Sequence, residues 1–188
     1  MIEEFNDKLG LGEENVELKT QRLSIRFINK NDWKSLIEIW NDFNNSEYAR
    51  YDIPHMDTEN EVRDKAKRWD EVSPGMEHAF FAILLEKDMI GYVDFHKTSD
   101  GYECGYCFHS KYHGKGYARE SIETLLHYMS NGRKMRFAAG TALENIPSVK
   151  LLLSLGFEKI DEEQVSLYKD QNGNDIYFKG GIFALNVG

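Results

Sequence analysis

Two glycines flank a lysine just ahead of an amphipathic stretch, in the segment YHGKGYARESIETLL at residues 112–126. The first N–H groups of a helix have no partner inside the helix, and the helix dipole adds about half a positive charge there. Glycine lets phosphate oxygens approach the backbone closely, and Lys115 and Arg119 bring full charges nearby. The segment therefore predicts either a phosphate-binding loop or an ordinary helix start.

Two familiar nucleotide-binding motifs do not fit this segment. A P-loop needs a serine or threonine after its lysine, but Lys115 is followed by Gly116, and no glycine lies five positions before Gly114. A dinucleotide-binding fingerprint needs a third glycine where Arg119 stands. What remains is a strand, a short glycine-bearing loop and a helix N-terminus, which together can bind phosphate through backbone N–H groups.

Four nearby residues have the spacing of a zinc site, C-x2-C-x-H-x3-H, and they are Cys104, Cys107, His109 and His113. Their segment, YECGYCFH, is rich in aromatic residues and predicts a strand. Residues three apart in a strand point to opposite faces. We therefore expect no metal and two inert thiols, as is usual in a reducing cytoplasm.

Composition limits the possible functions of the chain. Its 188 residues suit one domain, 1–188, in which residues 1–16 form a polar arm or a short helix. No apolar run reaches the roughly 18 residues of a membrane span, and the acidic start does not resemble a secretory signal. The net charge of −9 disfavours nucleic acid as a partner and permits a positively charged substrate. We expect a cytoplasmic protein.

Apolar periodicity predicts a mixed, largely antiparallel sheet with helices on both faces. Strands are expected at 17–28, 78–87, 89–98, 102–109 and 135–142, helices at 29–43, 58–69, 116–129 and 145–156, and a final hairpin at 164–185 that turns through Asn172 and Gly173. Asn31 or Asp32 should cap the first helix, and Thr58 with Glu61 has the pattern of a capping box. Pro147 suits the start of the last helix.

Four segments resemble the GNAT superfamily of acyl-CoA-dependent N-acetyltransferases, and especially its ribosomal-protein N-terminal (alanine) acetyltransferases. They follow one another along the chain in the same order as in the family. The family's pyrophosphate loop reads Q/R-x-x-G-x-G/A; Gly116 and Ala118 match it, whereas His113 replaces the usual glutamine or arginine. The other three segments are LKTQRLSIRFINKND, YECGYCFH and ALENIPSVKLLLSLGF, the last matching the subgroup's N-x-x-S and GF at Asn145, Ser148, Gly156 and Phe157. The resemblance covers about residues 17–185.

This resemblance implies a GNAT-like sheet that splays open between the strand ending near His109 and the strand MRFAAGTA. Coenzyme A would lie in the gap, with its pyrophosphate on residues 113–119, its pantetheine along residues 108–110, and Asn145 near its amides. The cofactor-binding residues so expected are Phe108, His109, Ser110, His113, Gly114, Lys115, Gly116, Tyr117, Ala118, Arg119, Asn145 and Ser148.

The implied reaction, direct attack of a primary amine on the thioester of acetyl-CoA, needs a proton acceptor. An alkyl ammonium titrates near pH 10, so it must lose a proton to a base, directly or through a water. Glu103 is the first candidate because it lies on the strand that lines the gap, and Asp94 and His96 on the neighbouring strand come next. Glu103 is equally well explained as a solvated strand residue or an ion-pair partner, and His109 and His113 as polar loop residues.

The leaving thiolate needs a proton donor. The subgroup's N-x-x-S serine, often given that role, corresponds to Ser148, which would also suit a simple helix-capping hydroxyl. Tyr112 and Tyr168 are the alternative donors. A backbone N–H in the splayed strand can stabilise the oxyanion.

The acceptor is left open as a protein N-terminus or a small-molecule amine. In this family the segment corresponding to residues 41–55 commonly shapes the acceptor site, whereas the aromatic side chains of Trp40, Phe43, Tyr48 and Tyr51 are expected in the core. The alternative functions are a non-catalytic acyl-CoA-binding module and a zinc-binding interaction domain. A homodimer is possible.

Overall fold

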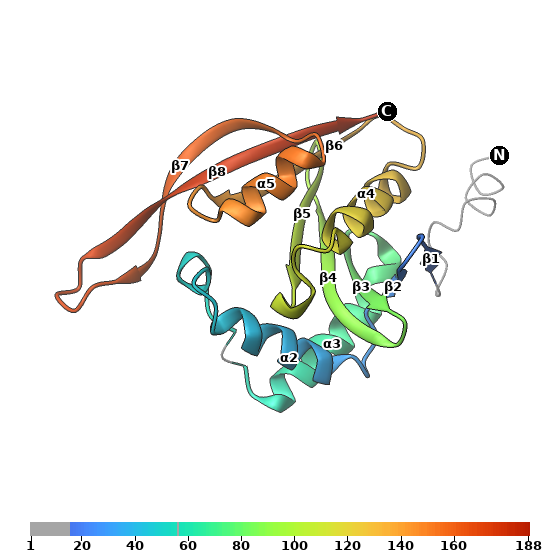
Figure 1. Cartoon of the computed structure of the whole chain (residues 1–188), viewed down its shortest axis with the longest axis horizontal. Helices are drawn as coiled ribbons and strands as arrows, with labels where there is room; N and C mark the ends of the chain where they lie inside the picture. Colours follow the sequence, from blue (N-terminus) through green and yellow to red (C-terminus); the bar gives the residue numbers. More distant parts are fainter. Residues whose placement is uncertain (1–15, 56) are drawn as a thin grey trace.

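The computed structural model describes residues 16–55 and 57–188, so the predicted N-terminal arm lies outside the described residues except for its last position. In this part of the chain an eight-stranded sheet runs in the order β1-β2-β3-β4-β5-β6-β8-β7, with helices on both faces (Figure 1). All neighbouring strands are antiparallel except β5 and β6. The predicted mixed, mostly antiparallel sheet is confirmed.

The strands are β1 (Glu17–Lys19), β2 (Ser24–Phe27), β3 (His78–Leu85), β4 (Asp88–Lys97), β5 (Gly101–Phe108), β6 (Met135–Ala142), β7 (Glu158–Lys169) and β8 (Asp175–Val187). The helices are α2 (Trp33–Asn44), α3 (Glu59–Val72), α4 (Tyr117–Ser130) and α5 (Ile146–Ser154), with short 3-10 turns η1 (Ala49–Tyr51), η2 (Ser73–Gly75) and η3 (Ser110–Tyr112). No helix among the described residues has the length and apolar composition needed to cross a bilayer.

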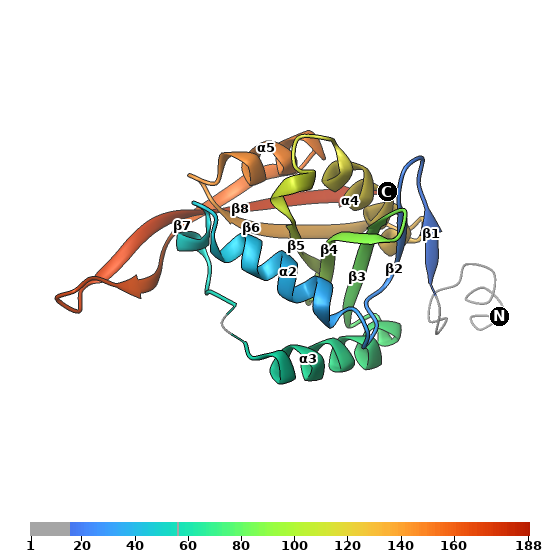
Figure 2. The same cartoon turned by 60° about the horizontal axis from the view of Figure 1, so that its bottom comes forward.

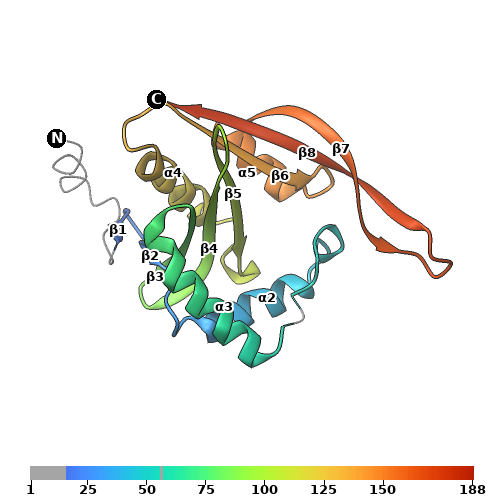
Figure 3. The ribbon, with the colours of Figure 1, turned by 180° about the vertical axis from the view of Figure 1, so that it is seen from behind.

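The sheet separates two hydrophobic cores. The face covered by α4 and α5 buries aromatic and aliphatic side chains, including Phe81, Phe95 and Phe137. The other face, covered by α2 and α3, forms a smaller core around Trp40 and Tyr92. Figures 2 and 3 show the two helix pairs on opposite sides of the strands. This alternation of buried side chains between faces follows from the two-residue period of a strand.

The β5–β6 pair is where the sheet opens. Within the described residues these strands pair only over residues 101–103 of β5 and 136–138 of β6. Beyond that point β5 stays paired with β4 as far as Phe108, while β6 stays paired with β8 as far as Ala142. Each strand keeps its outer partner and loses its inner one, so the predicted splay is present.

Two strand predictions need correction. The expected continuous strand 17–28 is two short strands, because the Thr20 hydroxyl accepts a hydrogen bond from Leu23 N–H at 2.9 Å and closes a turn between them. The last hairpin is longer than expected. Its loop spans residues 170–174, where the Asp170 carboxylate accepts N–H bonds from Asn172 and Asn174 at 2.8 Å, and Gly173 takes the left-handed conformation at φ 83°.

The helix starts differ in how well the sequence predicted them. Asp32 occupies the N-cap position of α2, but its side chain forms no capping bond. Instead the carboxylate pairs with both amino groups of Arg26, at 2.7 and 2.8 Å, and accepts Asn29 N–H at 2.8 Å. It thereby ties the start of α2 to β2. The capping box of Thr58 and Glu61 is present as predicted at the start of α3.

We expect Thr58→Ala to lower the free energy of unfolding by about 1 kcal/mol, because an N-cap hydroxyl satisfies an otherwise unpaired N–H. Urea unfolding of the wild type and the variant measures this. Thr58→Ser is the matched control, since it keeps the hydroxyl and should retain most of the stability. Equal losses in the two variants would contradict the capping role.

Candidate active site

The glycine loop, residues 113–119, joins η3 to α4 in the conformation that a phosphate cradle needs. Gly114 and Gly116 have φ of 72° and 81°, in the left-handed region that favours glycine. Gly116 is the N-cap of α4 and supplies no side-chain hydrogen bond. The N–H groups of the first turn of α4 are therefore left without a capping side chain. The exposed side chains of Lys115 and Arg119 flank them.

Two contacts attach this loop to the rest of the fold. His113 Nε2–H donates to the carbonyl of Phe108 at 2.8 Å, which fastens the loop to the end of β5. The N–H and hydroxyl of Ser110 donate to the Asp42 carboxylate, each at 2.7 Å, which fastens η3 to α2. Burial alone would raise the pKa of Asp42, but these hydrogen bonds outweigh it and lower that pKa. Asp42 is therefore an ionised anchor.

These bonds affect the predicted pantetheine contacts at Phe108, His109 and Ser110. The Phe108 carbonyl already accepts from the loop, His109 N–H donates to Ile90 O at 3.0 Å, and Ser110 N–H is bound by α2. The β5 edge beyond Glu103, residues 104–107, lies opposite no strand in the described β5–β6 ladder. That open edge is the better candidate for a ligand's amides, and contacts at residues 108–110 stay a prediction.

The start of α5 brings a second group of polar side chains to the gap. Asn145 Oδ1 accepts Ser148 N–H at 3.3 Å, so the helix is capped by Asn145 and not by the Ser148 hydroxyl. The Ser148 hydroxyl instead shares a hydrogen bond of 2.8 Å with the Tyr106 hydroxyl on β5. Burial raises the pKa of Tyr106 well above its ordinary value, so this phenol keeps its proton. The Tyr106–Ser148 pair thus joins β5 to α5 with two hydroxyl groups.

Sequence reasoning did not single out Tyr106. The strand pattern placed an aromatic residue there, and nothing in the sequence showed which helix would meet it 42 residues later. The two alternative donors lie elsewhere. The Tyr112 hydroxyl donates to Asp88 at 3.4 Å, and the Tyr168 hydroxyl donates to the carbonyls of Ala49, at 3.3 Å, and Asp52.

The three predicted base candidates lie together on the α2/α3 face of the sheet. Asp94 and His96 follow Tyr92 at two-residue steps, and His96 is the register partner of Glu103 on β5. The Asp94 carboxylate covers Gly105, where an added Cβ would lie only 2.7 Å from its Oδ1. The glycine of GYC therefore makes room for Asp94 at the point where β5 leaves β6.

A chain of polar contacts links Asp94 to the protein surface. Asp94 Oδ1 lies 3.0 Å from His96 Nε2, and His96 Nδ1 lies 2.9 Å from Nδ1 of His78 on β3. Asp94 is 15% exposed and His96 39% exposed, so exposure increases along the chain. Two ring nitrogens at hydrogen-bond distance hold one proton between them. The arrangement can therefore pass a proton between a partly buried carboxylate and solvent.

The two cysteines lie on opposite faces of β5, as predicted. Cys104 is buried in the core under α4 and α5, whereas Cys107 packs against the core under α2 and α3. Burial raises the pKa of Cys104 well above its ordinary value and that of Cys107 to about 12. Both thiols are thus protonated and poorly nucleophilic. No group of three or more metal-ligating side chains forms among the described residues.

The segment after α2 meets the β7–β8 hairpin. The Tyr51 ring packs edge-on against Phe178 with centroids 5.3 Å apart. Between them opens a hollow of about 620 Å³ whose lining is largely aromatic and apolar, formed by Ala49, Arg50, Tyr51, Pro54, Glu144, Tyr168, Ile176, Tyr177 and Phe178.

The prediction that the aromatic side chains near the end of α2 lie in the core holds for Trp40, which is 2% exposed and donates Nε1–H to the Tyr92 hydroxyl at 3.1 Å. It is wrong for Tyr51, which lines the hollow.

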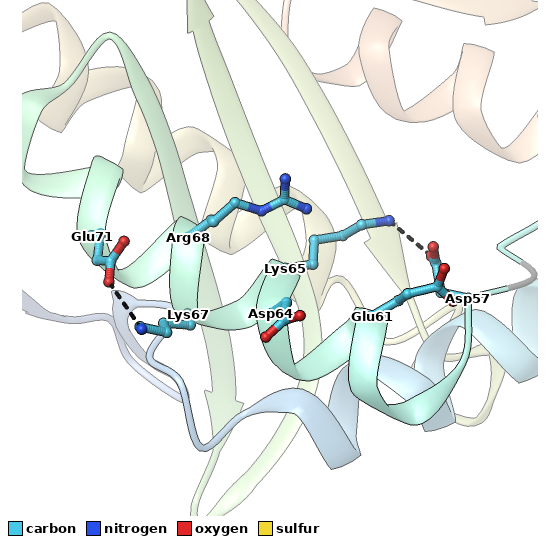
Figure 4. A pocket seen from close by; sticks show the side chains of 7 residues that line it. All are labelled: Asp57, Glu61, Asp64, Lys65, Lys67, Arg68 and Glu71. Carbon is cyan, nitrogen blue, oxygen red and sulfur yellow. Dashed lines mark hydrogen bonds and ion pairs between the residues drawn. The ribbon is translucent and has the colours of Figure 1, made fainter.

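A second hollow, of about 520 Å³, lies on the outer face of α3 (Figure 4). It is lined only by charged residues of both signs, namely Asp57, Glu61, Asp64, Lys65, Lys67, Arg68 and Glu71. Lys65 pairs with Asp57 at 2.8 Å and Lys67 approaches Glu71 at 3.9 Å. None of the predicted site residues lines it, and its mixed charges are typical of a solvated helix face.

Comparison with known proteins identifies the family. Residues 22–158 match the model of the acetyltransferase (GNAT) domain, so the chain belongs to this family and is an acetyl-CoA-dependent acyltransferase. It is 31% identical to the uncharacterized N-acetyltransferase p20 of Bacillus licheniformis, over 76% of this chain and 82% of that one. It is 29% identical to the uncharacterized N-acetyltransferase YnaD of Bacillus subtilis (strain 168), over 77% and 84%.

A solved structure shows the same fold. RimL, a ribosomal L7/L12 alpha-N-protein acetyltransferase in complex with coenzyme A, superimposes with a TM-score of 0.76 at 16% identity. The match covers 92% of this chain and 98% of that one. It confirms the GNAT-like architecture that the sequence predicted.

The His96 imidazole should make stability depend on pH. Its pKa is raised chiefly by the hydrogen bond to Asp94, although burial acts against this; Glu103 adds attraction, and His78 faces the other ring nitrogen. A raised pKa means that protonated His96 stabilises the fold fully below about pH 6.5, the pKa of an unfolded histidine, and that this stabilisation is lost as pH rises through the higher folded value.

We therefore expect His96→Gln to lower the free energy of unfolding more at about pH 5.5 than at about pH 8.5. Urea unfolding at the two pH values measures the difference. His127→Gln, at an exposed position on α4, is the control for general effects of losing a histidine. A loss for His96→Gln that is constant across pH would contradict the Asp94 interaction.

Proposed function

We propose that the protein transfers acetyl from acetyl-CoA to a primary amine that enters from the α2/α3 face of the sheet. One observation carries this proposal. The gap between β5 and β6 has carboxylates, Asp94 and Glu103, on one face of β5 and a hydroxyl pair, Tyr106 and Ser148, on the other. Acyl transfer to an amine is accelerated by a proton acceptor near the amine and a proton donor near the departing thiolate.

The glycine loop supplies the expected site for the pyrophosphate of the donor. The loop lacks side-chain atoms at Gly114 and Gly116 and exposes the N-terminus of α4, so phosphate oxygens can reach several N–H groups at once. Lys115 and Arg119 add positive charge there. The pantetheine would follow the open edge of β5 toward Asn145. The coenzyme A complex of RimL supports the choice of ligand.

The chemistry follows from the two faces. The neutral amine attacks the thioester carbonyl, the new C–N bond forms, and the C–S bond breaks. The ammonium ion loses its first proton to a carboxylate, from which the proton passes to solvent, before the attack, and the nitrogen loses a second proton in the same way as the C–N bond forms. The Tyr106–Ser148 pair gives a proton to the departing thiolate and regains one from solvent. Both hydroxyls remain protonated at neutral pH, because burial raises the pKa of Tyr106 and an aliphatic hydroxyl does not ionise there.

Asp94 is the base that the geometry favours over Glu103. It lies beside Gly105, two residues further along β5 toward the open end than Glu103, and its carboxylate lies 3.0 Å from His96, the first imidazole of the chain that leads to the surface. Glu103 is exposed and adds negative charge that attracts an ammonium ion. The sequence prediction of Glu103 as base stays open to the test below.

The acceptor is a cationic primary amine, either a protein N-terminus or a small molecule. The carboxylates of Asp94 and Glu103 favour positive charge, and the segment 41–55 with the hollow beside Tyr51 would hold the rest of the acceptor. The name of RimL, an alpha-N-protein acetyltransferase, supports the first class. We infer a cytoplasmic reaction, consistent with the unbonded thiols of Cys104 and Cys107.

Calorimetric titration with acetyl-CoA tests the cradle. We expect binding to the wild type and none to Gly116→Trp, because an indole at this position collides with Arg22, which lies 3.3 Å from the added Cβ, and displaces the loop whose N–H groups the phosphates need. Gly132→Trp is the matched control. Gly132 has φ 68° at the other end of α4, so that variant carries the same backbone strain away from the loop. Failure of the wild type to bind acetyl-CoA would overturn the proposal.

Four variants test the proton transfers, with transfer to a panel of amines as the readout. We expect Asp94→Asn and Ser148→Ala to lower kcat by about 100-fold, the usual scale of general acid–base catalysis, with acetyl-CoA affinity unchanged. Glu103→Gln should mainly raise KM for the amine, and Tyr106→Phe should resemble Ser148→Ala. A full kcat loss in Glu103→Gln with normal Asp94→Asn would restore Glu103 as the base. Tight acetyl-CoA binding without transfer to any amine would indicate a non-catalytic binding module.

A further inference from the structure

The turn between β1 and β2, residues 20–23, lies against the first turn of α4, 98 residues further along the chain. Three hydrogen bonds from this turn converge on one carboxylate. Glu120 accepts the Thr20 hydroxyl at 2.5 Å, the Arg22 N–H at 3.1 Å and Arg22 Nε–H at 2.7 Å. Burial alone would raise the pKa of Glu120, but these bonds lower it, so the carboxylate is ionised and fixed.

The same arginine also reaches the glycine loop. Arg22 Nη1–H donates to the carbonyl of Lys115 at 2.9 Å, and its guanidinium lies 4.5 Å from the centre of the Tyr117 ring. An added Cβ on Gly116 would lie 3.3 Å from Arg22 Nη2. One planar side chain therefore spans from Glu120 to the middle of the loop. A lysine could not do this, because it presents a single point of charge and not a fork.

The contact with the Lys115 carbonyl fixes the direction of a neighbouring N–H. In a trans peptide the C=O and the following N–H point in opposite directions, and the structure has no cis peptide among its described residues. When Arg22 holds the Lys115 carbonyl, the Gly116 N–H must point away from Arg22, to the other side of the loop. This peptide joins Lys115 to Gly116, and Gly114 precedes Lys115. Because glycine backbones rotate most freely, the peptide needs an external anchor.

We propose that Arg22 is a positioning residue for the diphosphate of coenzyme A, acting by turning the Gly116 N–H into the cradle. The role rests on the proposed function of the glycine loop. Arg22 does not serve as a phosphate-binding charge, because Glu120 at 2.6 Å neutralises it. The β1–β2 turn, far from the loop in sequence, is thus part of the donor site.

The test is the dissociation constant, by calorimetry, of two probes, coenzyme A and 3′-dephospho-coenzyme A, which share the diphosphate. We expect Arg22→Ala to weaken both by the same factor, about tenfold, the value of one oriented hydrogen bond to a charged group. Arg22→Lys should weaken both nearly as much, because it keeps the charge and loses the fork. Arg63→Ala, which removes an arginine paired with Glu59 on α3, away from the glycine loop, should bind both probes like the wild type.

Three outcomes would overturn the proposal: unchanged affinity in Arg22→Ala, full affinity in Arg22→Lys, or a loss confined to coenzyme A, which would place Arg22 on the 3′-phosphate. A calorimetric stoichiometry near one shows that a variant is folded. If Arg22→Ala does not fold, Arg22→Gln takes its place, and we expect it to weaken the binding of both probes by the same factor. A wild type that binds neither probe would refute the donor site itself, which separates that failure from failure of the Arg22 role.

Discussion

The parting of β5 from β6 is the constraint on which the rest of the site depends. Each strand keeps its outer neighbour, β4 or β8, so the sheet stays continuous at its edges while its middle opens. On the side of β5 away from β4, the backbone N–H and C=O groups of residues 104–107 face no strand in the described β5–β6 ladder, and such groups favour a partner inside a protein. A ligand that carries amide groups is the natural complement of such an edge.

Strand alternation then assigns chemistry to the two sides of the gap. Tyr106 points toward α5 and meets Ser148, whereas its neighbour Gly105 faces the other way and makes room for Asp94. The residue without a side chain matters as much as those with one, because a larger residue at Gly105 would displace the carboxylate. A single strand of ordinary geometry thus places the proposed proton donor and the proposed proton acceptor on opposite sides of the sheet.

The sequence predicted the features that arise from short-range patterns. The capping box at Thr58, the opposed faces of Cys104 and Cys107, and the glycine loop ahead of α4 all depend on residues within a few positions of one another. The resemblance to a family added the opening between β5 and β6 and the expected position of coenzyme A. Periodicity alone does not determine either of them.

The features that sequence reasoning missed depend on contacts between distant segments. Tyr106 meets Ser148 across 42 residues, and Asp42 meets Ser110 across 68. Tertiary packing also overrode local preference at Asp32, whose carboxylate bonds Arg26 and not the helix that it precedes. The turn at Thr20 broke an alternating pattern that favoured one strand. Such contacts follow from the packing of whole elements, which one sequence does not reveal.

The long β7–β8 hairpin, which extends well past the rest of the sheet in Figure 1, has a consequence for how this enzyme can diversify. Its Phe178 ring packs against Tyr51, and its Tyr168 hydroxyl donates to the carbonyl of Ala49, both in the segment after α2. The hydrogen bonds described for the glycine loop go instead to the β1–β2 turn, β5 and η3. These two sets of contacts share no residue. A change in the length or the side chains of the hairpin would alter the hollow beside Tyr51 and leave the contacts described for the glycine loop as they are. Such a change would alter which acceptor fits, while the proposed coenzyme A site stays the same.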